Sequence, residues 1–414
     1  MHYGCIAQRL GHSFSPEIHA QLGTYRYELC ELTPDAVGKF LEKRDFLGIN
    51  VTIPYKETVI PYLSHIDEQA ERIGAVNTVV NRGGRLYGYN TDFYGMQSLI
   101  ERLGLSLEGK KVAVLGTGGT SRTAVAVAEA MGASEVLRVS RTAKDGALDY
   151  ETLTRVHRDV AVIINTTPCG MFPNPDAAAV DVGDFPTLLG VVDAVYNPLR
   201  PKLVLDAKKR GIAAEGGLYM LVAQAVRASE LFLDTTYPQG TVERVYKKLM
   251  RQKENVVLIG MPSSGKSTVG KLLAARMGRA FVDTDDLIVQ TTGKSIPEIF
   301  SEEGESGFRK IESQVIREQV SQKNATVIAT GGGAILREEN LDALRRNGRL
   351  YFLDRPLSDL IPTDDRPLSS TREAVETRYR ERYPRYCAAA DVRIPVTGDA
   401  ASVAENIEKE YLAE

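Results

Sequence analysis

The hydrophobic residues beyond residue 110 form short runs that alternate with segments of helical periodicity. A first series contains the β-branched runs VAVLG, EVLRVS, VAVIINTT and LLGVVDAVY, and a second series contains NVVLIG, AFVDTD, TVIATGGG and RLYFLD. Short apolar strands that alternate with helices are typical of βαβ units around a parallel sheet. The pattern therefore predicts an α/β protein with two successive strand–helix series.

A charged segment of helical composition, VERVYKKLMRQKEN at 242–255, lies between the two series. It contains no tract rich in Pro, Gly or Ser, so we expect a close junction rather than a flexible tether. The length of 414 residues independently predicts two to three domains.

Composition narrows the classes of function. The formal net charge is −3, which argues against a broad surface for nucleic acid or anionic membranes. The four cysteines are widely separated and form no CxxC pair, as expected in a reducing compartment; they are Cys5, Cys30, Cys169 and Cys387. The N-terminus lacks the pattern of a signal peptide, and no apolar run reaches the roughly eighteen residues of a membrane span. We expect a soluble cytoplasmic protein with no nucleic-acid or membrane partner. The five histidines are not spaced as a ligand set, and we expect no zinc site.

The stretch GMPSSGKST at 260–268 fits the Walker A pattern and lies between an apolar strand and a helical segment. Backbone N–H groups of such a loop converge on nucleotide phosphates, while Lys266 reaches the outer phosphates and the Ser267 hydroxyl binds Mg²⁺. We therefore expect ATP and Mg²⁺ here. The residues expected around the nucleotide are Gly260, Ser263, Gly265, Lys266, Ser267 and Thr268.

Further polar motifs follow this loop in a fixed order. Asp283 and Asp285 lie at a predicted strand end, where open α/β sheets place ligands. Arg309 and Glu312 are three residues apart on one helix face, a spacing that more commonly marks a surface ion pair. The remaining motifs are TGGGA at 330–334, DRPLS with Arg366, and RYPRY with Arg382.

Together these motifs resemble shikimate kinase over 254–414. The resemblance implies that Asp285 anchors the shikimate hydroxyls and assists deprotonation, and that Ser267 and Asp283 hold the metal. It also implies that Arg309, held by Glu312, grips the carboxylate together with Arg382, and that Arg366 faces the transferring phosphoryl group. The implied catalytic residues are Lys266, Asp285 and Arg366, and the implied shikimate contacts include Gly331, Gly332 and Gly333.

A second glycine loop lies in the first half of the chain. Gly116, Gly118 and Gly119 stand between KVAVL and the helical segment SRTAVAVAEAMG, as in dinucleotide-binding units. The next strand ends in SRT at 140–142. An acidic residue there would bind a ribose 2′-hydroxyl, whereas Arg141 suits a 2′-phosphate, so NADP is favoured over NAD. A plain surface arginine is the other interpretation.

The first hundred residues add their own polar set. In SFSP, Ser13 and Ser15 precede Pro16, which we expect at the first helical position after a Ser cap. Two hydroxyls at a helix N-terminus also make a small carboxylate site. Other candidates, each singly an ordinary loop residue, are Asn50, Thr52, Lys56, Asn77 and Asp92.

With the later motifs INTTPCGM, VYNPL and GGLYMLVAQA, this order resembles shikimate dehydrogenase over about 1–250. The resemblance implies that Lys56 and Asp92 are the catalytic pair for reduction of 3-dehydroshikimate by NADPH, Lys56 protonating the forming alkoxide. It implies that Ser13 and Ser15 hold the carboxylate and that Tyr196 lines the cleft. The implied contacts to ring oxygens are Asn50, Thr52, Asn77 and Gln224, and the implied NADP contacts are Gly116, Gly118, Gly119, Ser140, Arg141 and Thr142.

The two resemblances predict three domains: a substrate-binding domain at 1–100 completed by 216–250, a Rossmann domain at 101–215, and a P-loop kinase domain at 254–414. Two consecutive enzymes on one chain are thus expected. A metabolite sensor without chemistry is a rival, which the presence of Lys56, Asp92, Lys266 and Asp285 disfavours. Quinate in place of shikimate, or another small polyol acid as kinase substrate, stays open.

Three departures from the family patterns stand out. The residues TSRT follow the glycines where small residues are usual, and Ser140 replaces a common Asn. The interval from Arg355 to Arg366 holds three aspartates and no Lys or Arg, although family lids usually supply one. One hypothesis is therefore a kinase that binds or turns over MgATP weakly, and the other is that Arg366 suffices.

Overall fold

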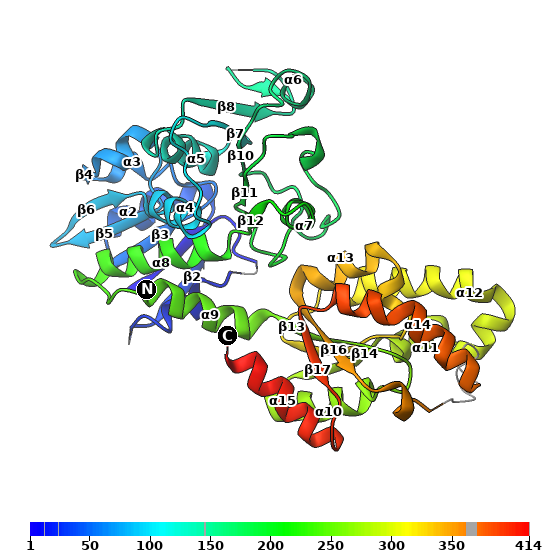
Figure 1. Cartoon of the computed structure of the whole chain (residues 1–414). Helices are drawn as coiled ribbons and strands as arrows, with labels where there is room; N and C mark the ends of the chain where they lie inside the picture. Colours follow the sequence, from blue (N-terminus) through cyan, green and yellow to red (C-terminus); the bar gives the residue numbers. More distant parts are fainter. Residues whose placement is uncertain (12, 24, 145, 362–370, 414) are drawn as a thin grey trace. The chain divides into compact units, whose positions relative to one another are not determined.

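The computed structural model describes residues 1–11, 13–23, 25–144, 146–361 and 371–413. These residues divide into two compact units, Met1–Leu249 and Met250–Glu414 (Figure 1). The division falls inside helix α9, Thr241–Lys253, so the charged segment predicted as a helical junction is a helix.

The N-terminal unit begins with a mixed six-stranded sheet. Its strand order is β2-β1-β3-β5-β6-β4, with β1 parallel to β2 and β3, and β5 antiparallel to both its neighbours. The strands, in that order, are Tyr27–Glu31, Tyr3–Ala7, Gly48–Val51, Thr78–Arg82, Arg85–Tyr89 and His65–Ile66. The accompanying helices are α1 (Ser15–His19), α2 (Pro34–Lys43), η1 (Ile60–Tyr62), α3 (Glu68–Ile73) and α8 (Leu218–Leu233).

A second six-stranded sheet of this unit is parallel throughout, in the order β12-β11-β10-β7-β8-β9. The strands, in that order, are Ala213–Glu215, Gly190–Asp193, Val162–Asn165, Lys111–Leu115, Glu135–Ser140 and Leu148–Asp149. The helices are α4 (Thr91–Arg102), α5 (Gly119–Ala130), α6 (Tyr150–Val156), η2 (Val182–Asp184) and α7 (Lys202–Lys209). The predicted parallel βαβ series of the first half is confirmed.

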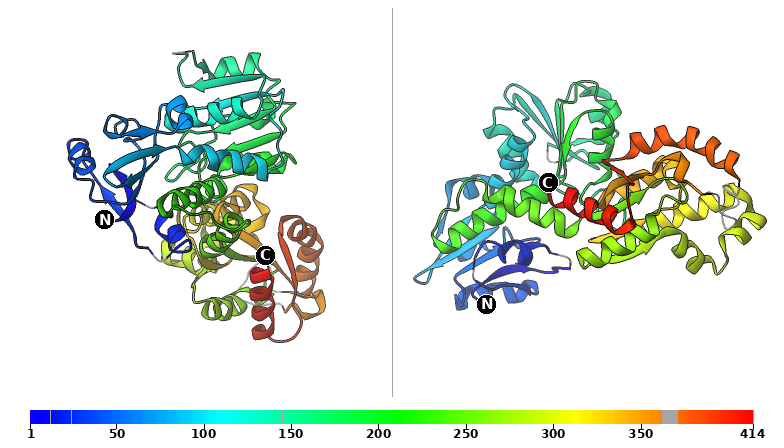
Figure 2. Two further views of the ribbon diagram at one scale, coloured as in Figure 1. Left: turned by 90° about the vertical axis from the view of Figure 1, so that its left-hand side faces the viewer. Right: turned by 60° about the horizontal axis from the view of Figure 1, so that its bottom comes forward.

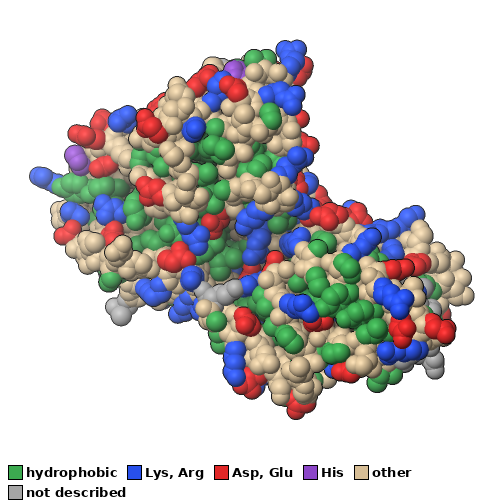
Figure 3. All heavy atoms as spheres, viewed as in Figure 1, with side chains coloured by type: hydrophobic (Ala, Val, Ile, Leu, Met, Phe, Trp, Pro, Cys, Tyr) green, Lys and Arg blue, Asp and Glu red, His purple; other side chains and the backbone are tan. Residues whose placement is uncertain are grey.

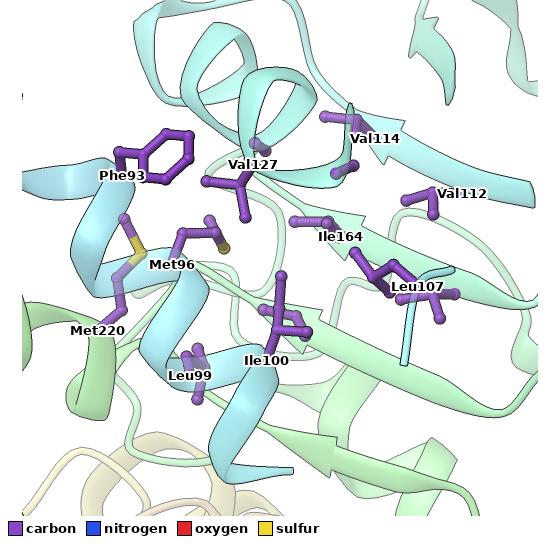
Figure 4. Packing of buried hydrophobic residues seen from close by; sticks show 14 of the residues in the cluster. Phe93, Met96, Leu99, Ile100, Leu107, Val112, Val114, Val127, Ile164 and Met220 are labelled. Carbon is purple, nitrogen blue, oxygen red and sulfur yellow. The ribbon is translucent and has the colours of Figure 1, made fainter. Parts of the chain in front are cut away.

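Alternate residues of the central strands bury both faces of this sheet. Val112, Val114 and Ile164 pack against Met96 and Val127 of α4 and α5 (Figure 4). Their neighbours along the strands face the opposite layer, which contains residues of α6 and α7. A strand buried on both faces reads as a continuous apolar run, which is why these strands were visible in the sequence.

The C-terminal unit is a five-stranded parallel sheet in the order β14-β15-β13-β16-β17. The strands, in that order, are Ala280–Asp283, Thr326–Ala329, Asn255–Ile259, Gly348–Asp354 and Val392–Pro395. The helices are α10 (Lys266–Met277), α11 (Thr284–Thr292), α12 (Ile296–Val315), η3 (Ile316–Val320), η4 (Ala334–Leu336), α13 (Glu338–Asn347), η5 (Leu357–Asp359), α14 (Arg372–Ala389) and α15 (Ala400–Ala413).

Helices cover both faces of this sheet as well (Figures 1 and 2). One face packs against α13 and α14, and the other against α10 and α15. All strands run in the same direction, so the loops that follow them meet at one edge of the sheet, where open α/β sheets bind ligands.

Acidic and basic side chains are interspersed over the face of each unit seen in Figure 3. None of the helices in the described ranges combines the length and apolar character of a transmembrane segment.

Candidate active sites

The catalytic pair expected in the N-terminal unit is in contact. Lys56 lies in the loop after β3, and Asp92 lies in the first turn of α4. The Lys56 ammonium donates to Asp92 Oδ2 at 2.5 Å, and the two side chains are 13% and 12% exposed. A hydrogen bond of 2.8 Å from the Val76 amide to the Lys56 carbonyl anchors the loop. The pair is thus desolvated and oriented.

The glycine loop that follows β7 reaches this pair. A Cβ atom on Gly119 would lie 3.9 Å from the Lys56 side chain. Gly116 has φ +114, and a Cβ atom there would lie 2.6 Å from Thr166 Oγ1, so glycine is required. Apart from its chain neighbours, none of the described residues comes within 4 Å of a Cβ position on Gly118, at the start of the twelve-residue helix α5. An open helix N-terminus of this kind suits the pyrophosphate of a dinucleotide.

The turn after β8 lies beside this loop. The Gly116 amide donates to the Val139 carbonyl at 2.7 Å, which joins the two strand ends. The Ser140 hydroxyl accepts from the Thr142 amide at 3.3 Å and donates to its carbonyl, so it fixes the turn that carries the exposed Arg141. Arg141 is therefore at the edge where the ribose of a bound dinucleotide would lie.

Two predicted substrate contacts of the N-terminal unit, Asn50 and Asn77, are hydrogen-bonded to other buried side chains and to backbone groups. The Asn50 amide is engaged by protein groups: its oxygen accepts from Tyr27 at 2.7 Å, and its nitrogen donates to Thr78 Oγ1 at 3.1 Å. Asn77 accepts from the Thr91 amide at 2.7 Å. Asn50 and Asn77 thus belong to one buried hydrogen-bond network, of which Tyr27 and Thr91 are members that sequence reasoning missed.

The SFSP segment differs from the prediction in one detail. Helix α1 begins at Ser15 itself, its N-cap is Phe14, and no side chain of the described residues caps it. The expected Ser cap before Pro16 is therefore wrong, because Pro16 stands one position further into the helix. The Ser13 hydroxyl instead accepts from the Ser15 amide at 3.3 Å. The Phe14 ring packs on the Tyr196 ring, with 5.4 Å between their centroids. This contact places the SFSP segment beside the loop that carries Tyr196.

The last two predicted contacts to substrate ring oxygens, Gln224 and Thr52, lie on different elements. Gln224, on α8, is 8% exposed and accepts a 3.4 Å hydrogen bond from Thr91 Oγ1, so it joins the Asn77 network. Thr52 follows β3, and its amide donates to the Ile6 carbonyl at 3.1 Å.

Sequence reasoning missed a buried acid, Asp193, which lies just before Tyr196 in the chain. Asp193 ends β11, is fully buried, and accepts 2.9 Å hydrogen bonds from the Asn165 side chain and the Val195 amide. Burial raises the pKa of Asp193 to about 7. The signal in the sequence was a pair of polar residues ending two otherwise apolar strands, since Asn165 and Asp193 are register partners.

In the C-terminal unit, the Walker loop surrounds the end of β13. Gly260, Ser263 and Gly265 all have positive φ values, a conformation that aims backbone N–H groups into the loop. The Lys266 ammonium donates to the carbonyls of Gly260 and Met261 at 2.9 and 2.8 Å. Thr268 is exposed in the first turn of α10.

The metal-binding prediction concerns two oxygen-bearing side chains that the structure brings together. The Ser267 hydroxyl donates to Asp283 Oδ2 at 2.6 Å, and the other Asp283 oxygen accepts from the Asp285 amide at 3.0 Å. A hydroxyl and a carboxylate at the end of a phosphate loop fit Mg²⁺, which prefers oxygen ligands and keeps several waters.

The arginine–glutamate pair is buried, so the expectation of a surface ion pair is wrong. Arg309 Nη1 donates to Glu312 at 2.7 Å, with side chains 10% and 0% exposed. The pair is buried because α12 presents this face to the TGGGA segment. Burial raises the pKa of Glu312, against the opposing effect of Arg309. On its outer side Arg309 also contacts Glu305 at 3.3 Å.

The three glycines of TGGGA allow this cluster to form. A Cβ atom on Gly331 would lie 2.7 Å from Asp285 Oδ1, and one on Gly333 would lie within 2.3 Å of the Arg309 guanidinium. The Gly332 carbonyl accepts from Arg382 at 3.1 Å. The structure therefore brings together the residues that were predicted to contact shikimate: Asp285, Arg309, Glu312, Gly331, Gly332, Gly333 and Arg382.

A cavity of about 620 Å³ opens beside the cluster, with Glu305, Arg378 and Arg382 in its lining. Arg366 lies outside the described residues, as do Asp364 and Asp365 of the acidic interval.

The fold and sites define two classes of protein on one chain: a dinucleotide-dependent oxidoreductase with a Lys–Asp pair, followed by a P-loop kinase. A family model described as Shikimate dehydrogenase substrate binding domain matches residues 5–79, and one described as Shikimate kinase matches 262–412. The N-terminal part of the chain belongs to the shikimate dehydrogenase family, and the C-terminal part is a shikimate kinase domain.

Relatives support the first half in detail. The shikimate dehydrogenase (NADP(+)) of Clostridium perfringens SM101 is 38% identical over 265 residues, which are 60% of this chain and 97% of that protein. The corresponding protein of Geobacillus kaustophilus HTA426 is 38% identical over 250 residues, covering 55% and 91%.

Solved structures show the same fold. A chorismate mutase/shikimate 5-dehydrogenase fusion protein from Clostridium acetobutylicum matches with a TM-score of 0.57 and 31% identity, over 60% of this chain and 96% of that one. The shikimate 5-dehydrogenase of Thermus thermophilus, in complex with NADP(H) and shikimate, matches with a TM-score of 0.54 and 29% identity, over 60% and 99%. The predicted fold class and both family assignments are confirmed.

Proposed function

We propose that this chain catalyses two consecutive reactions: reduction of 3-dehydroshikimate to shikimate with NADPH, and phosphorylation of the shikimate 3-hydroxyl with MgATP. One observation in each unit carries the proposal. A Lys–Asp pair touches the dinucleotide loop in one unit, and a phosphate loop is followed by a buried arginine–carboxylate cluster in the other. We place the domains at 1–100 with 216–250, at 101–215 and at 254–414.

In the reductase, bound NADPH would supply a hydride for reduction of the C3 carbonyl of the substrate. Lys56 donates the proton that the forming alkoxide oxygen takes up, so the product is a neutral hydroxyl. Asp92 holds the Lys56 ammonium at 2.5 Å and keeps it aimed at the cleft. Ser13 and Ser15 bind the substrate carboxylate, and the ring oxygens are bound by Asn50, Thr52, Asn77 and Gln224. Arg141 binds the 2′-phosphate that distinguishes NADP from NAD.

In the kinase, Asp285 holds the shikimate hydroxyls and orients the 3-hydroxyl for attack. Arg309 and Arg382 bind the carboxylate, which fixes the ring by its opposite end. Glu312 keeps the Arg309 guanidinium in place from the buried side. Ser267 and Asp283 would hold Mg²⁺, which would supply charge neutralisation at the phosphates. Lys266 would leave the loop carbonyls to bind the outer phosphates.

A coupled assay on the purified full chain tests the proposal. NADPH oxidation with 3-dehydroshikimate is followed first, MgATP is then added, and the product is identified by mass spectrometry. We expect shikimate, then shikimate 3-phosphate. Lys56→Ala should form neither product from 3-dehydroshikimate but should still phosphorylate supplied shikimate, whereas Lys266→Ala should form shikimate and no shikimate 3-phosphate. Quinate and 3-dehydroquinate are run in parallel, and faster turnover of either would contradict the proposed substrate.

A further inference from the structure

Arg355 carries a positive charge beside the Walker loop at 260–268. The sequence predicted no binding or catalytic role for it. Arg355 directly follows β16, the strand that pairs with β13 (Figure 1). Phe352 of β16 is the register partner of Ile259. Because the two strands are parallel, their carboxyl ends lie together. The segment after β16 therefore runs beside the loop that starts at Gly260.

Two close approaches define where Arg355 lies. A Cβ atom on Gly260 would lie 2.9 Å from the Leu353 carbonyl, so the end of β16 packs against the first glycine of the loop. A Cβ atom on Gly265 would lie 3.7 Å from Arg355 Nη2, so the guanidinium lies against the last glycine. Gly265 immediately precedes Lys266 and α10, where phosphates are bound.

The guanidinium has a donor left over. Arg355 Nε is buried and has no hydrogen-bond partner among the described residues. The nearby Arg393 behaves differently, because Asp354 and the Tyr383 hydroxyl engage its guanidinium at 2.5–2.6 Å. A buried donor without a partner is uncommon in native proteins, and a bound ligand is one way to satisfy it.

We propose that Arg355 binds a phosphate oxygen of the nucleotide in the kinase unit. The planar guanidinium suits phosphate, and it approaches from the strand end beside Gly265. The sequence places no Lys or Arg between Arg355 and Arg366. Arg355 would thus supply cationic charge from the sheet edge rather than from the interval before Arg366. The proposal rests on the proposed kinase function only in taking a nucleotide as the ligand.

The test measures binding to the full chain by displacement of a fluorescent ADP analogue. The competitors are MgADP and inorganic tripolyphosphate, which has phosphates but no base or ribose. Arg355→Ala should weaken both about tenfold or more, and Arg355→Lys should weaken them less. The matched control is Arg276→Ala. Arg276 lies on α10 and pairs with Glu408 at 2.7 Å, so its removal should leave both affinities within twofold. Arg355→Gln carries the test if the alanine variant fails to fold.

Unchanged affinities in the Arg355 variants would overturn the proposal. So would weaker MgADP binding with unchanged tripolyphosphate binding, because that result assigns the contact to the base or ribose. Shikimate phosphorylation by the wild type is measured separately. If it is absent while Arg355→Ala still weakens tripolyphosphate binding, the proposed kinase function fails and the Arg355 assignment stands.

Discussion

The ammonium nitrogen of Lys56 lies 2.5 Å from a carboxylate oxygen of Asp92, across 36 positions of the chain. Lys56 comes from the loop after β3 in the mixed sheet, whereas Asp92 opens α4, which packs on the parallel sheet. The N-terminal end of a helix is a favourable place for a carboxylate. The pair therefore links the mixed sheet to a helix that packs on the parallel sheet.

Removal of this lysine should separate the two activities. We expect Lys56→Ala to lower dehydrogenase kcat by about 10²- to 10⁴-fold, the usual loss of a general acid, with kinase activity unchanged. Steady-state kinetics of both reactions on the same preparation provide the measurement. Lys39→Ala, an exposed lysine on α2, is the control and should leave both activities intact. An equal fall of the two activities in Lys56→Ala would contradict the assignment of Lys56 to one site.

Cofactor choice gives a second prediction. Arg141 is exposed at the end of β8, on the turn that Ser140 fixes. Arg141→Ala removes a charged donor from the 2′-phosphate, so the KM for NADPH should rise about 10- to 100-fold. The KM for NADH should change less than twofold, because NADH has no 2′-phosphate. Similar increases for both cofactors would exclude Arg141 from this contact.

The sequence predicted correctly those features whose residues lie close together in the chain. The parallel strands were visible because burial on both faces makes them continuous apolar runs, and the phosphate loop was visible because Gly260, Gly265 and Lys266 must stand at fixed spacing. Burial of Arg309 and Glu312 was not visible, since three-residue spacing fixes a shared helix face but not what packs against it.

Hydrogen bonds between segments that are distant in the chain were also not predicted from the sequence. Tyr27 reaches Asn50 through the pairing of β2, β1 and β3, which no local pattern encodes. Asp193 was missed for the same reason: its partner Asn165 is 28 positions away, and only strand register brings the two together.

The buried acid Asp193 predicts a pH-dependent stability. Its pKa is about 7 in the folded protein, compared with roughly 3.9 in an unfolded chain. Between these values the folded state holds a proton that the unfolded state has lost. The free energy of unfolding should therefore fall as the pH rises through this window, by at most about 1.4 kcal/mol per pH unit.

Asp193→Asn keeps the oxygen that accepts from Asn165 and Val195 but cannot ionise. We expect the variant to lose this fall and to exceed the wild type in stability at pH 8. Calorimetry on the full chain measures it, with the dehydrogenase transition identified by its shift on adding NADPH. The same pH dependence in wild type and Asp193→Asn would show that Asp193 is not its source.

Two carboxylates on one arginine should act in opposite directions on the kinase. Glu312 is fully buried and contacts Arg309 at 2.7 Å, whereas Glu305 is 48% exposed and contacts it at 3.3 Å from the cavity side. Glu312 holds the guanidinium in place, so Glu312→Gln should raise the KM for shikimate by about 10- to 100-fold. Glu312→Ala should in addition destabilise the kinase unit by about 3–5 kcal/mol, since it removes the buried partner of Arg309 and leaves only the partly exposed Glu305.

Glu305 contacts Arg309 Nη2 from the cavity side, and we predict that it competes with the substrate carboxylate for this guanidinium. Glu305→Gln should therefore lower the KM for shikimate by about two- to fivefold, the range expected for a partly exposed ion pair. High salt should shrink this difference, because the exposed pair is screened while the buried one is not. Glu318→Gln, an exposed glutamate beside Arg317, serves as the control. A higher KM in Glu305→Gln would show that Glu305 helps to position Arg309 instead of competing for it.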